Sequence, residues 1–407
     1  MADVNPSALG ARAEAMIKAL APVSSEPDKL VRLFLSAEHR RAADLVAQWM
    51  REAGMNVTED ALGTVRGRIG EGPRLLIGSH LDSVVDGGNY DGPLGVIAGI
   101  VAVGHFGSKP PIPIDVLAFG DEEGSRFPST YASSSACVGV FDFETLRLAD
   151  RNGMTLAEAL QAYGKNPGDI AKAAYAAGEA AGYVEVHIEQ GPLLEAANQA
   201  LGVVTGIVGQ SRWRTIVTGE AGHAGTVPMT MRRDAMAGAA EMALAVERIG
   251  SAGDQMVATV GRIEAKPGAT NIIPGQVVFT VDLRCMDDKI RHAAVTQFEN
   301  EARRIAAARK LEVEFEHFHD TPAAACDPVL QDKIAASIGD VGGRDIRMPS
   351  GAGHDAQMMA RLCPSVMLFV RCRGGISHNP AEYASPADMG LAVAALIKFI
   401  DGFKPKD

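Results

Sequence analysis

The stretch that decides the fold is residues 75–119, LLIGSHLDSVVDGGNYDGPLGVIAGIVAVGHFGSKPPIPIDVLAF. It begins with a short apolar run, 75–79, which is typical of a buried strand. Residues 92–106 favour a buried helix, and residues 112–119 form a second apolar run bounded by prolines. Strand, helix and strand in this order predict a βαβ unit, and hence an α/β fold in which helices flank a sheet.

The same alternation continues on both sides of this unit. Upstream, the apolar spacing of residues 28–50 predicts a helix. Downstream, the Ala-rich stretch 156–181 predicts a helix, and residues 182–188 alternate with the period of two that indicates a strand. Near the end of the chain a strand is expected at 365–370 and a closing helix at 386–400.

Between these parts the order of elements changes. One strand, a helix, two strands, a helix and a strand are expected at 213–218, 233–249, 255–264, 276–284, 287–309 and 311–318. This βαββαβ order predicts a compact α/β-sandwich domain inserted into the larger one. We therefore expect a discontinuous host domain, 1–208 and 322–407, and an insert at 209–321.

Composition excludes several classes of protein. The 407 residues are 47% hydrophobic and carry a net charge of −11, which argues against a broad surface for nucleic acid or an anionic membrane. No apolar run approaches the ~20 residues that a membrane-spanning helix needs, and the first residues lack the pattern of a secretory signal. Five irregularly spaced cysteines argue against a disulfide framework or a thiolate zinc site. We expect a cytoplasmic protein.

Polar side chains gather at the end of the first predicted strand. His80 and Asp82 follow it directly, and Asp91 precedes the next helix. His80 offers a ring nitrogen, Asp82 could hold the other N–H of that ring, and Asp91 has two oxygens able to bridge two cations. The alternative for this isolated segment is a polar loop with a helix-capping aspartate.

A second cluster follows the strand at 112–119. Its three consecutive acids, Asp121, Glu122 and Glu123, repel one another unless cations neutralise them. A metal-bound carboxylate at Glu123 beside a free base at Glu122 is one solution, and a solvated acidic turn is the other.

Two more histidines lie at strand-to-loop junctions. His187 ends the strand at 182–188, with Gln190 in the loop beyond, and His378 lies in a Gly-rich turn. Alone, each is equally explained as a core or turn residue. Together with His80, Asp91 and Glu123 they supply the nitrogen and oxygen ligands of a two-metal hydrolase centre.

Competing chemistries are poorly represented. The chain has no Gly-x-Ser-x-Gly elbow, Walker loop, His-Glu-x-x-His pair or Gly-x-Gly-x-x-Gly after a strand. An amidase with Cys137 as nucleophile stays conceivable, although small residues surround that cysteine as in ordinary packing. In the insert, Arg284 with a neighbouring Asn271 and His223 could clamp a carboxylate, and each alone also fits a turn or surface position.

Taken together, the motifs resemble those of the amidase/hydantoinase-carbamoylase branch of the dinuclear zinc peptidase and aminoacylase superfamily, over nearly the whole chain. The motifs that carry the resemblance are Gly78-Ser79-His80-Leu81-Asp82, Asn89-Tyr90-Asp91-Gly92, Glu122-Glu123-Gly124-Ser125-Arg126-Phe127, His187-Ile188-Glu189-Gln190-Gly191-Pro192, Gly222-His223-Ala224-Gly225-Thr226, Ser350-Gly351-Ala352-Gly353-His354-Asp355 and Gly375-Ile376-Ser377-His378-Asn379-Pro380.

The resemblance implies a zinc-peptidase-like catalytic domain with two divalent ions (zinc, manganese or cobalt) in each subunit. Asp91 would bridge them, with His80 and His187 completing one site and Glu123 and His378 the other. The further roles that it implies are a base at Glu122, a supporting catalytic role for Asp82, oxyanion stabilisation by His223, and substrate contacts by Gln190, His223, Asn271, Arg284, Gly353 and Ser377.

The resemblance also implies that the insert is a mobile lid and dimerisation domain, whose partner copy contributes to a homodimer's active sites. The substrate would be a small ureido carboxylate. Residues 368–378 most resemble allantoate amidohydrolases, and N-carbamoyl-L-amino-acid hydrolases and β-ureidopropionases remain alternatives. A dipeptidase is disfavoured by His187, because the related peptidases usually have a carboxylate there. An inactive metal-stabilised binding protein is disfavoured by Glu122, because a binding module needs no base.

Overall fold

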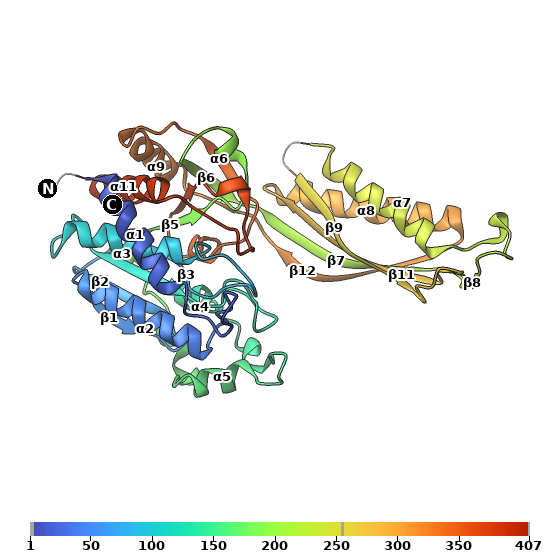
Figure 1. Cartoon of the computed structure of the whole chain (residues 1–407), viewed down its shortest axis with the longest axis horizontal. Helices are drawn as coiled ribbons and strands as arrows, with labels where there is room; N and C mark the ends of the chain where they lie inside the picture. Colours follow the sequence, from blue (N-terminus) through green and yellow to red (C-terminus); the bar gives the residue numbers. More distant parts are fainter. Residues whose placement is uncertain (1–3, 254–255, 406–407) are drawn as a thin grey trace. The chain divides into compact units, whose positions relative to one another are not determined.

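The computed structural model describes residues 4–253 and 256–405, and the chain divides into two compact units (Figure 1). The first comprises Met1–Gly206 and Cys326–Asp407, and the second comprises Ile207–Ala325. The expected insert, 209–321, lies within the second unit. The observed division begins two residues before that range and ends four residues after it.

The first unit is built on a mixed sheet in which strands follow the order β1-β2-β4-β3-β5-β15-β6, and β14 (Arg347–Ser350) also pairs with β6. The strands are β1 (Asn56–Glu59), β2 (Val65–Ile69), β3 (Arg74–His80), β4 (Ile114–Phe119), β5 (Ala180–Ile188), β6 (Leu201–Ile207) and β15 (Ser365–Val370). Four neighbours, β4, β3, β5 and β15, run parallel, and β2 and β6 pair antiparallel on either side of them. The expected α/β fold, a mixed sheet flanked by helices, is confirmed.

Helices enclose this sheet, which explains why its central strands are apolar throughout. Every residue of β3, β4 and β15 is buried, as expected for parallel strands covered on both faces. The helices of the unit are α1 (Pro6–Leu20), α2 (Ala37–Glu52), α3 (Pro93–Phe106), α4 (Ala132–Cys137), α5 (Leu156–Ala162), α6 (Leu193–Ala196), α9 (Pro328–Asp340), α10 (Ala356–Met359) and α11 (Pro386–Gly402). Helices α1, α3 and α11 pack against one another.

Two helices expected from the sequence are wrong in extent. Residues 28–36 are not helical, because Leu35 takes a left-handed φ of 56° and Ser36 caps the start of α2 by accepting a hydrogen bond from the backbone N–H of His39. The Ala-rich stretch 156–181 is α-helical only to Ala162; a 3₁₀ helix over Pro167–Ala173 follows, and β5 begins at Ala180. Gly164, with φ 83°, ends the α-helix.

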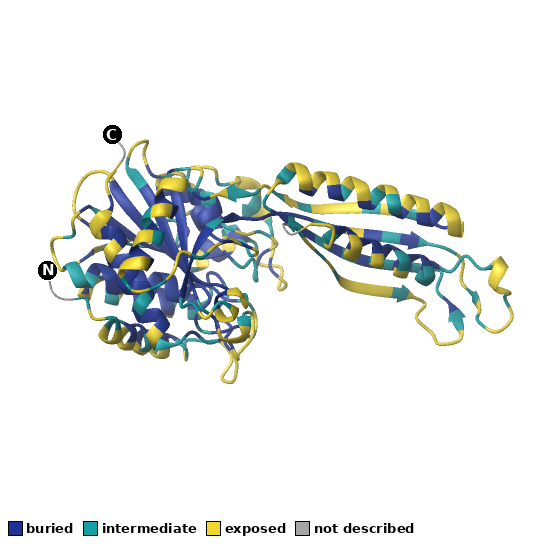
Figure 2. Ribbon diagram, turned by 90° about the horizontal axis from the view of Figure 1, so that it is seen from above, coloured by how far each residue is buried: buried dark blue, intermediate teal, exposed yellow. Residues whose placement is uncertain are grey.

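The second unit is an α/β sandwich. Its sheet has the antiparallel order β12-β7-β11-β9, from β7 (Gly209–Thr218), β9 (Met256–Lys266), β11 (Gln276–Cys285) and β12 (Glu312–Thr321). Helices α7 (Ala235–Gly250) and α8 (Asp288–Arg309) share a core with it, and Figure 2 shows their outer faces exposed. The βαββαβ order is confirmed, except that Gln255 lies outside the described residues. A ribbon of β8 (Gly222–His223) and β10 (Ile272–Ile273) is added.

Two further features concern the cysteines and the apolar character of the helices. The five cysteines are buried and free, in agreement with the expected lack of a disulfide framework. Within residues 4–253 and 256–405, none of the helices combines the length and apolar character that a bilayer crossing requires.

Candidate metal centre

The residues predicted to bind metal lie at the carboxyl ends of the parallel strands. His80 is the last residue of β3, and His187 is the penultimate residue of β5. Glu123 follows β4, which ends at Phe119, and His378 follows β15. Because carboxyl ends of neighbouring parallel strands meet at one edge of the sheet, four distant segments converge there.

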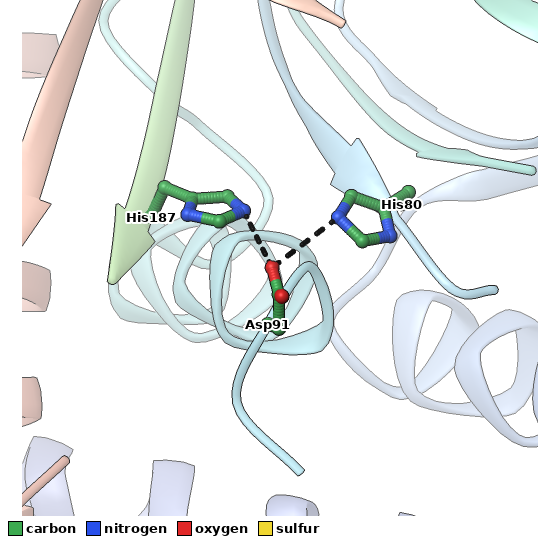
Figure 3. A group of neighbouring side chains, drawn as sticks. All are labelled: His80, Asp91 and His187. Carbon is green, nitrogen blue, oxygen red and sulfur yellow. Dashed lines mark ion pairs between the residues drawn. The ribbon is translucent and has the colours of Figure 1, made fainter. Parts of the chain in front are cut away.

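Asp91 stands at the centre of this convergence. Its Oδ1 atom lies 3.1 Å from Nε2 of His187 and 3.7 Å from Nε2 of His80, and Figure 3 shows both rings pointing at that same oxygen. Its Oδ2 atom lies 3.2 Å from Nε2 of His378, which is 3.6 Å from Oε2 of Glu123. Each oxygen of one carboxylate therefore faces a separate set of donors.

The hydrogen bonds of His80 and His187 orient both rings for metal binding. Nδ1 of His80 lies 3.0 Å from the backbone carbonyl of Asp82, and Nδ1 of His187 lies 2.9 Å from that of Ile188. A carbonyl only accepts, so each Nδ1 carries a proton, and Nε2 is the ring atom of each histidine that can bind a cation beside Asp91. Nε2 of His187 is buried and has no hydrogen-bond partner among the described residues. A ring nitrogen that faces a carboxylate in this way requires a positive charge between them, either a proton or a bound cation.

The electrostatics agree with this interpretation. Burial lowers the pKa of His80 and His187, but the neighbouring carboxylates outweigh it and raise both pKa values above the ordinary one. Burial alone would raise the pKa of Asp91, yet the three histidines hold it well below its usual range. Protons on these rings stand in for the positive charge that bound cations would supply, since metal binding displaces ligand protons.

Glu122 and Glu123 occupy a turn that Asp82 holds in place. Oδ1 of Asp82 accepts a hydrogen bond from the backbone N–H of Glu122 at 3.3 Å, and its Oδ2 accepts one from the N–H of Glu123 at 3.2 Å. Sequence reasoning gave this side chain to the ring of His80, but its Oδ1 is 3.5 Å from Nδ1, farther than the carbonyl of the same residue. The carboxylate of Asp82 therefore positions the two glutamates, because each of its oxygens accepts a hydrogen bond from the backbone N–H of one of them.

The two glutamates differ in surroundings. Glu122 is 8% exposed, and burial raises its pKa well above the ordinary value. Its Oε2 lies 3.9 Å from Nε2 of His80. Burial, followed by the charge of Asp91, raises the pKa of Glu123 to about 7.

Several triads of donor atoms lie close enough to hold an ion. They are His80, Asp91 and His187; Asp91, Glu123 and His378; His80, Glu122 and Glu123; and Glu185, His187 and His354. The first two sets coincide with the two ligand sets implied by the family resemblance, and they share Asp91. Imidazole and carboxylate donors suit zinc, manganese and cobalt.

Of the predicted substrate contacts, three lie in this unit. The amide nitrogen of Gln190 donates to Oδ2 of Asp91 at 3.0 Å and lies 3.3 Å from Oγ of Ser377. The amide oxygen of Gln190 is buried and has no hydrogen-bond partner in the described part of the chain, so it is available to accept one. Gly353 is partly buried between β14 (Arg347–Ser350) and α10, directly before His354.

The other three lie in the second unit, at two places. His223 pairs with Ile272 across the ribbon, and the backbone N–H of Ala224 donates to the carbonyl of Asn271 at 3.0 Å, so His223 and Asn271 are neighbours. Arg284 makes two hydrogen bonds to the carboxylate of Asp282, at 2.9 and 2.8 Å.

The ribbon joins the start of β11, and Arg284 lies eight residues farther along that strand. At ~3.3 Å per residue, Arg284 lies roughly 26 Å from the end of β11 at which the ribbon joins. Within one chain, Arg284 is therefore not a neighbour of Asn271, because an extended strand separates them.

Sequence reasoning missed Glu382, Glu185 and the ring contact of His354. Glu382 is buried and accepts hydrogen bonds from the backbone N–H groups of Tyr90 and Asp91. His354 packs on His187 with ring centroids 4.4 Å apart. The motif that contains His354 was the only available signal for it, whereas Glu382 lies four residues after His378 in a segment interpreted as a turn.

Comparison with known proteins identifies the family. Residues 76–402 match the family model described as peptidase family M20/M25/M40. An allantoate deiminase of Arabidopsis thaliana is 40% identical, over 98% of this chain and 83% of the relative. An N-carbamoyl-L-amino acid amidohydrolase of Geobacillus stearothermophilus is 39% identical, over 93% of this chain and 94% of the relative.

A solved structure agrees with these relatives. An amidase of the hydantoinase/carbamoylase family from Burkholderia multivorans has a TM-score of 0.90 and 34% identity, and the match covers 96% of this chain and 97% of that one. The chain belongs to peptidase family M20/M25/M40, in its hydantoinase/carbamoylase amidase branch, and is a hydrolase of C–N bonds other than peptide bonds.

Proposed function

We propose that this protein is a dinuclear metal-dependent amidohydrolase that cleaves a ureido C–N bond in a small carboxylate, with allantoate as its preferred substrate. The observation that carries the proposal is the arrangement around Asp91, whose two oxygens face two separate donor sets. When bound there, two divalent cations supply Lewis-acid polarisation and lower the pKa of a water molecule. The relatives named above act on allantoate and N-carbamoyl amino acids.

The side chains of the chain supply the remaining chemistry. Glu122 takes the proton of the attacking water and passes it to the leaving nitrogen. The free amide oxygen of Gln190 accepts a hydrogen bond from the ureido NH₂ group. His223 donates to the oxygen on which negative charge develops, and Arg284 and Asn271 bind the substrate carboxylate.

Substitution of Glu122 tests the mechanism. Glu122→Gln keeps the size of the side chain but removes the base, so we expect zinc binding to persist while kcat falls about 10²- to 10⁴-fold, the usual contribution of general acid–base catalysis. The measurement is ammonia release together with metal content. Undiminished turnover in this variant would remove Glu122 from the role of base.

A substrate panel tests the choice of allantoate. Ammonia release is measured on allantoate, several N-carbamoyl-L-amino acids and N-carbamoyl-β-alanine, with zinc-, manganese- and cobalt-loaded protein. We expect the highest kcat/KM on allantoate. A preference for a carbamoyl amino acid would overturn the substrate and leave the reaction class intact, whereas activity on none of them would refute the proposed function.

The separation of Arg284 from Asn271 supports a homodimer formed through the second unit. Arg284 lies roughly 26 Å along β11 from the end of that strand at which the ribbon beside Asn271 joins. If both residues bind the same carboxylate, one of them would come from the other subunit. We also propose a cytoplasmic location, because the free cysteines fit a reducing compartment.

Mixing two inactive variants tests the shared site. If His223 acts across the dimer, a heterodimer of Glu122→Gln and His223→Ala chains contains one intact site. Random exchange should then restore about one quarter of wild-type activity. If His223 acts within its own chain, every site in the mixture is defective and no activity returns.

A further inference from the structure

A buried carboxylate outside the predicted ligand sets joins two loops of the centre. Oε1 of Glu382 accepts hydrogen bonds from the backbone N–H groups of Tyr90, at 2.8 Å, and Asp91, at 3.1 Å. Its Oε2 accepts one from Oγ of Ser377 at 3.0 Å. The side chain is only 4% exposed. One carboxylate therefore fixes the main chain that carries the bridging aspartate and the residue directly before His378.

The loop that carries His378 needs such an anchor. The His378 side chain is 51% exposed, so little packing restrains it. Its backbone takes a left-handed φ of 53°, which is uncommon outside glycine. Ser377 also reaches Oδ2 of Asp91, at 3.2 Å. The position of the His378 ring therefore depends on where Ser377 is held.

The loop that precedes Asp91 contains a glycine, Gly88, directly beside the side chain of Glu382. A Cβ atom at Gly88 would lie 2.3 Å from Cδ and Oε1 of Glu382, far inside contact distance. Gly88 has no left-handed φ to require a glycine. Any larger residue there would displace the carboxylate from the Tyr90 and Asp91 amides.

We propose that Glu382 is a positioning residue that sets the spacing between Asp91 and His378, two of the three residues of the second donor set. The inference rests on the proposed function only in that it concerns the same centre. Partners behind a ligand commonly change metal affinity 10- to 100-fold when removed, and Glu382 acts on two ligands at once.

The experiment is a zinc titration of the metal-free full-length protein in competition with a chromophoric chelator. We expect two zinc ions in the wild type. In Glu382→Ala the weaker site should lose about 10- to 100-fold in affinity. Glu382→Gln keeps an oxygen that accepts from both amides and an NH₂ group that can meet Ser377, so it should restore affinity to within about threefold.

Two further variants separate positioning from folding. Gly88→Ala retains the carboxylate but displaces it, and should reproduce the loss seen in Glu382→Ala. Glu195→Ala is the matched control: Oε2 of Glu195 accepts a hydrogen bond from the backbone N–H of Gly374 at 2.8 Å, so it holds the same loop from its exposed side without reaching Asp91. It should bind zinc as the wild type does.

The possible results of the titration separate the inference, the metal centre and the proposed function from one another. Wild-type zinc affinity in both Glu382→Ala and Gly88→Ala overturns the inference, and so does an equal loss in Glu195→Ala or no recovery in Glu382→Gln. A wild type that binds fewer than two zinc ions refutes the centre and the inference together. A wild type that binds two ions but hydrolyses no ureido acid refutes the proposed function alone, because the titration needs no substrate.

Discussion

Gly92 offers a sharp test of how the chain forms the centre. It precedes α3 with φ 83° and ψ −62°, a conformation that side chains rarely adopt. A Cβ atom there would lie 2.5 Å from Cε1 and Nδ1 of the His80 ring. The ring cannot move away freely, because its Nδ1 donates to the carbonyl of Asp82. Gly92→Ala should therefore disturb a metal ligand without removing it.

The expected magnitude has two parts. Backbone strain at such a φ costs about 1–3 kcal/mol, and overpacking a filled site adds about 1–3 kcal/mol more. Gly107 ends the same helix with φ 61°, and a Cβ atom at that position would meet no other atom within 4 Å, so Gly107→Ala carries the strain alone. Gly92→Ala should thus lose about 1–3 kcal/mol more stability than Gly107→Ala.

The assay is urea unfolding of both variants with a chelator present, followed by zinc titration. Gly92→Ala should also bind zinc about 10- to 100-fold more weakly than the wild type, because Nε2 of His80 is displaced. Gly107→Ala should keep the zinc affinity of the wild type. Equal losses of stability in the two variants, with unchanged zinc affinity in both, would refute the contact between Gly92 and His80.

Three other predictions follow from the same structure. Chelation should lower the free energy of unfolding, and zinc at one hundred times its Kd should restore about 2.7 kcal/mol for each site; a melting temperature insensitive to zinc would contradict the centre. Burial lowers the pKa of His39 to about 4, so the unfolded state binds more protons than the folded state between pH 6.5 and 4. Acidification over this range should lower the free energy of unfolding of the wild type by up to about 3 kcal/mol, and His39→Gln should not show this loss. Parallel plots of unfolding free energy against pH for the two proteins would disprove this prediction. Asp115 is fully buried and accepts hydrogen bonds from Arg68, Arg74 and the hydroxyl of Tyr175. Asp115→Ala should therefore destabilise the fold by about 3–5 kcal/mol, because it leaves the buried guanidinium of Arg74 without this carboxylate. A loss below about 1 kcal/mol in urea unfolding, the range of an exposed ion pair, would contradict this prediction.

Elements with a strong apolar period were predictable from the sequence. The strand at 365–370 has the bounds of β15, and the buried helix at 92–106 became α3. The failures occurred where single residues set a helix boundary, at Ser36 before the start of α2 and at Gly164 after the end of α5. Capping and left-handed turns depend on one position and not on a periodic pattern. The N-terminal α1 was missed entirely, although Asn5 caps it and Pro6 begins it.

The sequence by itself determined which residue types stand at the strand ends, and hence the N/O ligand chemistry of His80, Asp91 and His187. Only the tertiary structure decided how they are used, because hydrogen bonds and distances between segments far apart in the chain have no local signal. It gave the side chain of Asp82 to the acidic turn, placed Glu382 behind Asp91, and separated Arg284 from Asn271 by the length of an extended strand.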